Sequence, residues 1–243
     1  MKKVLITGAN KSIGFETARQ LLQKGYFIYL GARDLDKGEE AVAKLKAEGF
    51  DNVEAIKIDV IDTASIAAAR KQVTELDVLI NNAGISGGVS VPQTTGNIDT
   101  STIRTVFDTN FFGPINVIKA FIDLLKKSDE PRIVNVTSGL GSLTMHSDPN
   151  SKFYHIKSAA YGPSKTALNA YTVVLAYELK DANFKVNAVD PGYTATDFNH
   201  HSGPGSVEDA GKIIVKYATI GADGPNGKFF SNDADGETDE MAW

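Results

Sequence analysis

The 243-residue sequence contains no cysteine, a single tryptophan and only three methionines. Without cysteine the chain can form no disulfide, no thiolate metal site and no cysteine nucleophile. It also lacks long apolar runs, because no stretch approaches the roughly 18 residues that a membrane-spanning helix needs. The apolar run after Lys2 and Lys3 stops at Thr7, which is too short for the core of a signal peptide. We therefore expect a soluble, cytoplasmic protein with no membrane partner.

An excess of positive charge is missing as well. The chain has 25 basic and 30 acidic residues, for a formal net charge of −5. Nucleic-acid-binding domains usually carry a basic face, so no nucleic-acid partner is expected. Hydrophobic residues make up 42% of the sequence, which is enough for a large core. The length fits one α/β domain spanning residues 1–243.

Short apolar runs alternate with longer amphipathic stretches along the chain. Strands are predicted at residues 4–6, 27–30, 53–58, 78–80, 133–136, 185–189 and 228–230. Helices are predicted at residues 13–24, 36–48, 65–75, 100–127, 161–180 and 207–218. Such alternation indicates a parallel sheet covered by helices on both faces. The predicted fold class is α/β, a single-domain doubly wound Rossmann fold with a sheet of about seven strands.

A glycine-containing turn, residues 7–14, joins the first strand to the first helix. Gly8 permits a tight turn, Gly14 permits close packing of the helix on the sheet, and free N–H groups at the helix start can face a pyrophosphate. An ordinary strand-to-helix turn is the competing interpretation, but the position after the first strand favours a nucleotide. The cofactor-binding residues expected here are Gly8, Asn10, Lys11, Ser12, Ile13 and Gly14.

This turn resembles the Thr-Gly-x-x-x-Gly-x-Gly motif of the short-chain dehydrogenase/reductase family, with Ser12 replacing the middle glycine. Further motifs follow in the family's order up to residue 197, and the chain is most similar to the carbonyl-reductase branch. The resemblance implies an adenine contact at Asp59 and Val60. In the Asn-Asn-Ala-Gly segment it implies that the asparagines brace the sheet while Ala83 and Gly84 leave space for the adenosine ribose. Further cofactor contacts implied by the resemblance are Asn81, Pro191, Gly192, Thr194 and Thr196.

The residue that follows the second strand distinguishes the two nicotinamide cofactors. An enzyme that uses NAD places an acidic residue there to bind the ribose 2′-OH. This strand instead runs into Arg33, whose guanidinium suits the 2′-phosphate of NADP through bidentate hydrogen bonds. Lys11 adds a second positive charge, and both features resemble NADP-preferring members of the family. NADPH is therefore the expected cofactor, although a one-residue shift would make Asp34 a ribose ligand and favour NAD.

Tyr161 and Lys165 form the centre of the predicted chemistry. On a helix, residues four apart share one face. A free tyrosine is a poor base at neutral pH because its pKa is about 10, and a nearby ammonium should lower that pKa. The pair matches the family's Tyr-x-x-x-Lys motif, which implies that Tyr161 exchanges a proton with the substrate and Lys165 also binds the nicotinamide ribose. For the pair alone, a solvated helix face is the competing interpretation.

Ser138 and Asn110 complete the predicted catalytic set. Ser138 ends the fifth strand, on the sheet edge where ligands bind, and matches the family's catalytic serine that hydrogen-bonds the substrate carbonyl. Pro114 has no N–H to offer the Asn110 carbonyl, so the helix 100–127 should kink there. The resemblance implies that Asn110 binds a water that relays protons to the lysine.

The segment between Ser138 and Tyr161 is longer than in many family members, with an insertion at about 143–157. It resembles a shorter form of the insertion in monomeric carbonyl reductases, so a monomer or homodimer is expected rather than a tetramer. The predicted substrate loops are residues 86–96, 142–158 and 193–206. The histidines in these loops have no ligand spacing typical of a metal site, and no metal is expected.

The predicted function is reversible, NADPH-dependent reduction of a ketone or aldehyde to an alcohol, with a small carbonyl or alcohol compound as partner. A non-catalytic NADPH sensor of the same fold is the alternative, but a sensor should lack at least one of the four catalytic residues. An epimerase or dehydratase of the extended branch would usually carry a larger C-terminal substrate domain. The sequence does not identify the substrate.

Overall fold

The computed structural model describes residues 1–88, 94–234 and 238–243. Seven parallel strands form one sheet in the order β3-β2-β1-β4-β5-β6-β7. The strands are β1 (Lys3–Ile6), β2 (Phe27–Ala32), β3 (Val53–Lys57), β4 (Val78–Asn81), β5 (Arg132–Val136), β6 (Lys185–Asp190) and β7 (Phe229–Ser231). The strand order reverses between β1 and β4, which creates the crevice where doubly wound folds bind ligands.

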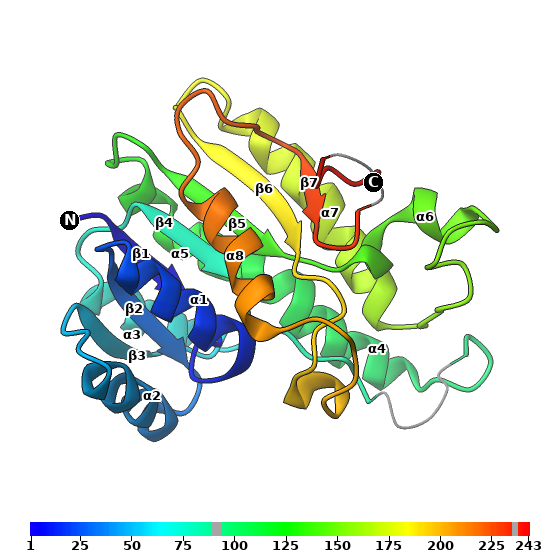
Figure 1. Cartoon of the computed structure of the whole chain (residues 1–243), viewed down its shortest axis with the longest axis horizontal. Helices are drawn as coiled ribbons and strands as arrows, with labels where there is room; N and C mark the ends of the chain where they lie inside the picture. Colours follow the sequence, from blue (N-terminus) through cyan, green and yellow to red (C-terminus); the bar gives the residue numbers. More distant parts are fainter. Residues whose placement is uncertain (89–93, 235–237) are drawn as a thin grey trace.

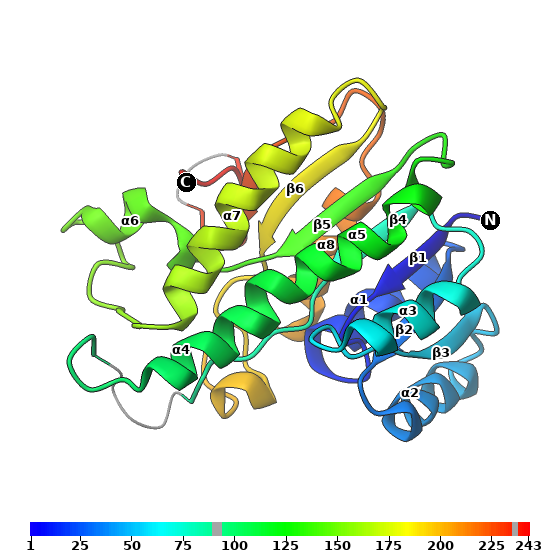
Figure 2. The ribbon, with the colours of Figure 1, turned by 180° about the vertical axis from the view of Figure 1, so that it is seen from behind.

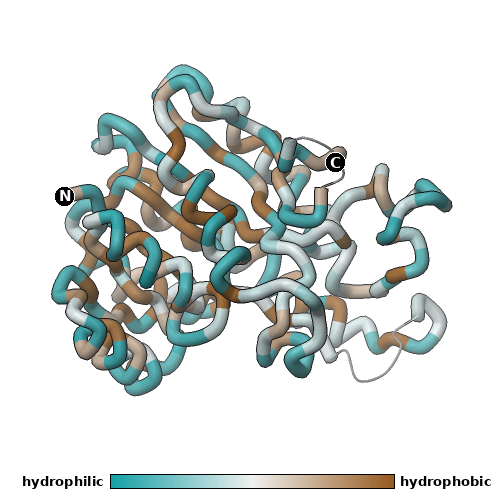
Figure 3. Tube along the Cα trace, viewed as in Figure 1, coloured by the Kyte–Doolittle hydropathy of each residue, from teal (hydrophilic) through white to brown (hydrophobic). Residues whose placement is uncertain are grey.

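Helices cover both faces of this sheet (Figures 1 and 2). One face carries α1 (Ser12–Gln23), α2 (Leu35–Ala47) and α8 (Val207–Ala218). The other carries α3 (Thr63–Gln72), α5 (Gly113–Leu125) and α7 (Tyr161–Glu178). The hydrophobic residues concentrate on the strands between these layers, and the hydrophilic ones on the outer helices and loops (Figure 3). The predicted doubly wound α/β fold with about seven parallel strands is therefore confirmed.

Two short helices, α4 (Thr100–Phe107) and α6 (Leu143–Ser147), lie beyond the carboxyl ends of the strands (Figure 2). The sequence did not predict α6, which Ser142 caps by accepting a hydrogen bond from the Met145 N–H. Within the described residues, no helix combines the length and the apolar character required to span a membrane.

The region predicted as one kinked helix at 100–127 is helical from 100 to 125, but a π-helical turn, Asp108–Phe112, separates α4 from α5. There the Gly113 N–H bonds to the carbonyl of Asp108, five residues earlier, so the chain accommodates Pro114 with a widened turn rather than a simple kink. Gly113, the first residue of α5, packs closely on Val60. A Cβ at this position would lie 2.8 Å from Cγ2 of Val60, so close packing on Val60 requires the glycine.

Side-chain caps account for small differences at other helix boundaries. The helix predicted at 65–75 begins earlier, because Asp62 caps its start by accepting from the Ala64 N–H at 2.8 Å. It ends at Gln72. Similarly, Asp34 is the N-cap of α2 and accepts from the Lys37 N–H. The helix predicted at 207–218 has the predicted bounds.

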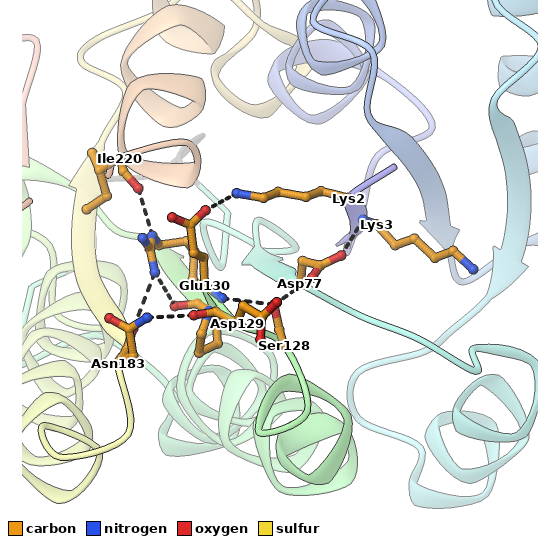
Figure 4. Close-up of polar contacts among 10 residues, drawn as sticks. Lys2, Lys3, Asp77, Ser128, Asp129, Glu130, Asn183 and Ile220 are labelled. Atoms are coloured by element: carbon orange, nitrogen blue, oxygen red, sulfur yellow. Dashed lines mark hydrogen bonds and ion pairs between the residues drawn. The ribbon is translucent and has the colours of Figure 1, made fainter. Parts of the chain in front are cut away.

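A polar network joins the amino ends of the strands, on the side opposite the predicted site (Figure 4). Its centre is Arg132, the first residue of β5, which is only 2% exposed. Its guanidinium donates to the carbonyls of Ile220 (2.8 Å), Pro131 (3.0 Å) and Asn183 (3.3 Å). The arginine thereby links the end of α8 to the loop that precedes β6.

We expect Arg132→Met to lower the free energy of unfolding by about 3 kcal/mol, because it leaves buried carbonyl groups without their charged donor. Urea unfolding measures this loss. Lys185→Met is the matched control, since Lys185 lies opposite Arg132 in the register of β6 and is only partly buried. Equal stability of the two variants would contradict a structural role for the Arg132 network.

Candidate active site

The four predicted catalytic residues come together at the carboxyl ends of the central strands. Ser138 lies two residues after the end of β5, Tyr161 begins α7, and Lys165 lies one turn further along α7. Asn110 lies in the π-helical turn, which packs against α7. The topology thus gathers side chains that are distant in the sequence.

The Ser138 side chain lies beside Tyr161, and its hydroxyl favours the ionised form of Tyr161. Burial has the opposite and larger effect, and with the negative charge of Asp190 it raises the pKa of Tyr161 well above its ordinary value. Tyr161 is therefore a phenol at neutral pH in this structure. The pKa of Tyr161 is therefore raised and not lowered as expected, because the cost of burying the phenolate is the largest effect on it.

Lys165 is buried, and its Nζ donates to the carbonyl of Val136 at 2.8 Å. The same Nζ lies 5.7 Å from the centre of the Tyr161 ring. Burial lowers the pKa of Lys165 to about 8, although the charge of Asp190 acts in the opposite direction. Lys165 therefore carries a positive charge that it gives up more readily than an exposed lysine.

Asn110 is fully buried and hydrogen-bonded on both ends of its amide. Its Oδ1 accepts from the Ile85 N–H at 2.8 Å, and its Nδ2 donates to the Ile85 carbonyl and to Ser164 Oγ. A Cβ built on Gly84 would lie 3.3 Å from Asn110 Oδ1 and 3.7 Å from Lys165 Nζ. The Asn110 side chain therefore braces the segment after β4 beside Lys165.

The glycine turn has the backbone that the motif requires. Gly8 has φ +65, and a Cβ there would lie 3.0 Å from Ala83 Cα. A Cβ on Gly14 would lie 2.7 Å from the Gly8 carbonyl oxygen. Ser12 adopts φ 51, a left-handed conformation that favours glycine, so the substitution in the motif costs strain that the sequence did not reveal.

The two asparagines after β4 have different roles. Asn82 holds the glycine turn, because its Nδ2 donates to the carbonyls of Thr7 (2.9 Å) and Gly8 (3.0 Å). The Asn81 side chain instead points into the sheet, where it donates to Asn135 at 2.9 Å. Asn81 was predicted to contact the cofactor. In the structure its buried side-chain amide bonds to the neighbouring strand β5.

Arg33 is exposed and directly follows β2. The Asp34 carboxylate is engaged in capping α2 and lies 3.9 Å from Lys37 Nζ. Lys11, the second predicted cation, forms an ion pair with Asp197 at 2.8 Å, and Asp197 also contacts His201 Nε2 at 3.0 Å. The sequence did not predict this connection between the glycine turn and the loop after β6.

The segment that follows β6 is held by its own hydrogen bonds. Gly192 has φ +81, and its N–H donates to Asp190 Oδ1 at 3.1 Å. Thr194 and Thr196 are buried, and the Thr194 hydroxyl donates to the Gly192 carbonyl at 3.1 Å. The adjacent Phe198 ring lies 5.4 Å from that of Tyr161. This contact places an aromatic side chain of the predicted loop 193–206 against the candidate catalytic tyrosine.

Asp59 and Val60 follow β3 as predicted. Asp59 Oδ1 accepts from the Ile61 N–H at 3.2 Å. Val60 is buried and packs against Gly113. The predicted loop 86–96 is described only in part, because residues 89–93 lie outside the described residues.

The insertion packs toward the C-terminus of the chain. The Ser142 hydroxyl donates to the Ala242 carbonyl at 2.7 Å, and the Thr144 N–H donates to the Trp243 carbonyl at 2.9 Å. Phe153 is buried in a small cluster with Ala188, Phe229 and Met241. Within the described part of the chain, histidines and carboxylates form no group of three or more that could bind a metal ion.

Comparisons with known proteins agree with this geometry. The model of the family described as short chain dehydrogenase matches residues 2–206. The (+)-neomenthol dehydrogenase of Capsicum annuum is 32% identical, over 93% of this chain and 94% of that protein. Salutaridine reductase from Papaver somniferum has a TM-score of 0.82 at 29% identity, over 96% of this chain and 100% of that chain.

The NADPH-bound carbonyl reductase from chicken fatty liver has a TM-score of 0.83 at 26% identity, and the match covers 100% of this chain and 99% of that one. These relatives are oxidoreductases that act on small molecules. The match over most of the chain and the shared fold agree with the motifs and with their convergence at one edge of the sheet. The chain therefore belongs to the short-chain dehydrogenase family.

Proposed function

We propose that the protein uses NADPH to reduce a ketone or aldehyde to an alcohol. The observation that carries this proposal is the convergence of Tyr161, Ser138 and Lys165 at one edge of the sheet, with buried Lys165 Nζ 5.7 Å from the centre of the Tyr161 ring. The raised pKa of Tyr161 agrees with it. A phenol that remains protonated at neutral pH is suited to act as a general acid, which is the role that reduction requires.

Each candidate catalytic residue then has a distinct task. Ser138 donates a hydrogen bond to the carbonyl oxygen and stabilises the negative charge that develops there. Tyr161 transfers its proton to the same oxygen. Lys165 supplies a positive charge beside Tyr161. Asn110 fixes the segment 84–85, which lies next to Lys165. In the reverse direction the Tyr161 phenolate would accept the proton of the alcohol.

The glycine turn fits a dinucleotide, because its tight packing at Gly8 and Gly14 admits no side chain and it leads directly into the start of α1, whose free N–H groups can bind a phosphate. When bound, the reduced nicotinamide supplies the hydride for the carbonyl carbon. Gly8, Asn10, Lys11, Ser12, Ile13 and Gly14 would hold the pyrophosphate half. Pro191, Gly192, Thr194 and Thr196 would border the nicotinamide.

A preference for NADP is supported by the charges around the end of β2. Arg33 is exposed and available, while the Asp34 carboxylate caps α2 by accepting from the Lys37 N–H. Lys11 would contribute a second cation once it exchanges Asp197 for a phosphate. The bound NADPH of the chicken carbonyl reductase supports the same preference.

The direct test follows the absorbance of the reduced nicotinamide while the protein turns over a panel of ketones and aldehydes, with NADPH and NADH in parallel. We expect carbonyl-dependent oxidation of NADPH and slower oxidation of NADH. A protein that binds NADPH tightly and reduces nothing in the panel would favour the sensor alternative. Faster turnover with NADH would contradict the Arg33 assignment and leave the reductase proposal intact.

A further inference from the structure

A buried carboxylate lies next to the candidate catalytic residues without belonging to them. Asp190 ends β6 and is 4% exposed. It pairs in register with Ser231 of β7, whose hydroxyl donates to Asp190 Oδ2 at 2.6 Å. The Gly192 N–H donates to Oδ1 at 3.1 Å. These partners are neutral, and burying a carboxylate among neutral groups is costly, so its position at the catalytic edge requires an explanation.

The same carboxylate lies against the backbone that follows Ser138. A Cβ built on Gly139 would lie 3.2 Å from Asp190 Oδ2 and 2.4 Å from Cζ of Phe153, which belongs to the insertion. Gly139 is thus packed closely against both Asp190 and Phe153, which fixes the start of the turn that follows Ser138.

Lys165 approaches the strand that carries Asp190, because its Nζ bonds to the carbonyl of Val136, and Val136 pairs with Val189, the residue before Asp190. The negative charge of Asp190 acts on both titratable groups of the site. It raises the pKa of Tyr161, and it raises the pKa of Lys165 against the effect of burial. Burial above all, with a contribution from the charge of Asp233 after β7, raises the pKa of Asp190 itself to about 6. Asp190 is therefore ionised at neutral pH. In the described residues, the titratable groups coupled to it are Tyr161 and Lys165 on α7 and Asp233.

We propose that Asp190 is a positioning residue whose buried negative charge keeps Lys165 protonated, while its packing on Gly139 and its hydrogen bond to Gly192 fix the two turns. The two parts of this role are separable. An asparagine has the same size and can retain the hydrogen bond to Gly192, but it removes the charge. Asp190→Asn therefore tests the electrostatic part directly.

The first measurement is an NMR titration of isotope-labelled lysine side chains, with Lys165→Arg used to assign the Lys165 signal. In Asp190→Asn we expect the midpoint of Lys165 to fall by roughly one pH unit, because the nearby opposite charge is gone. Asp233→Asn is the matched control, since its charge is not among those that shift Lys165. Equal Lys165 midpoints in the wild type and Asp190→Asn would overturn the proposal.

The second measurement is the pH dependence of carbonyl reduction, and this part rests on the proposed function. Because Asp190 raises the pKa of both Lys165 and Tyr161, its removal should shift the alkaline decline of kcat to lower pH. A purely structural role would lower kcat equally at all pH values. If the protein reduces no carbonyl compound but the lysine midpoint still shifts, the proposed function fails while the coupling of Asp190 to Lys165 stands.

Ser231→Ala keeps the test decisive if Asp190→Asn does not fold. It removes a hydrogen bond that lowers the pKa of Asp190, so less of the carboxylate is ionised near neutral pH. The Lys165 signal should then respond to the protonation of Asp190 at a higher pH than in the wild type. A Lys165 signal that does not respond to the protonation of Asp190 in either protein would overturn the proposal as well.

Discussion

Tyr161→Phe should lower kcat for carbonyl reduction by about 1000-fold, because it removes the proposed proton donor while keeping the ring. The ring contact with Phe198 does not require the hydroxyl, so the loop after β6 should retain its arrangement. Binding of NADPH should weaken little. The measurement is steady-state turnover with the best carbonyl substrate, together with the change in cofactor fluorescence on binding.

The matched control is Tyr177→Phe, on the same helix. Tyr177 is 69% exposed and lies far along α7 from the catalytic edge, so its hydroxyl has no expected role in turnover. Wild-type activity in both variants would refute the assignment of Tyr161 as the acid. Loss of cofactor binding in Tyr161→Phe would instead indicate a binding role for the hydroxyl.

Arg33→Ala should raise the KM for NADPH by roughly 10- to 100-fold, the value of one charge-assisted bidentate contact. The KM for NADH should stay the same, because NADH has no 2′-phosphate. Arg33 is exposed, so salt should screen part of the effect, and the measurement belongs at low ionic strength with a repeat at high salt.

Lys44→Ala provides the control for a loss of one positive charge, since Lys44 is exposed near the end of α2, away from Arg33. We expect no change in either KM for this variant. Similar KM values for both cofactors in the wild type, unaffected by Arg33→Ala, would show that Arg33 does not bind the phosphate. Asp34 would then need to be reconsidered as a ribose ligand.

The fold could be predicted from the sequence because it depends on local sequence patterns. The apolar strands, the helix periodicity and the glycine turn each depend on neighbouring residues, and alternating strands and helices leave few topologies. The four candidate catalytic residues were also found from short motifs. Their convergence followed from a general property of parallel sheets, whose carboxyl ends lie at one edge.

Contacts between segments far apart in the chain could not be predicted from the sequence. The widened π turn at Asp108–Phe112 and the packing of Gly113 on Val60 depend on how the long helix region meets the segment after β3. Likewise, Asn82 rather than Asn81 holds the glycine turn, because alternate residues at a strand end point to different neighbours.

The pKa values of Tyr161 and Lys165 show most clearly what the sequence can predict and what depends on the tertiary structure. A tyrosine four residues from a lysine predicted a lowered pKa at Tyr161, since charge spacing is visible in the sequence. Burial is not visible there, and in the structure it raises the pKa of Tyr161 and lowers that of Lys165. The sequence alone determined the fold class and which residues meet at the edge of the sheet. Only the tertiary structure decided their pKa values and placed the charge of Asp190 near Tyr161 and Lys165. The reason is that desolvation and the distances between charges depend on the packing of the whole chain.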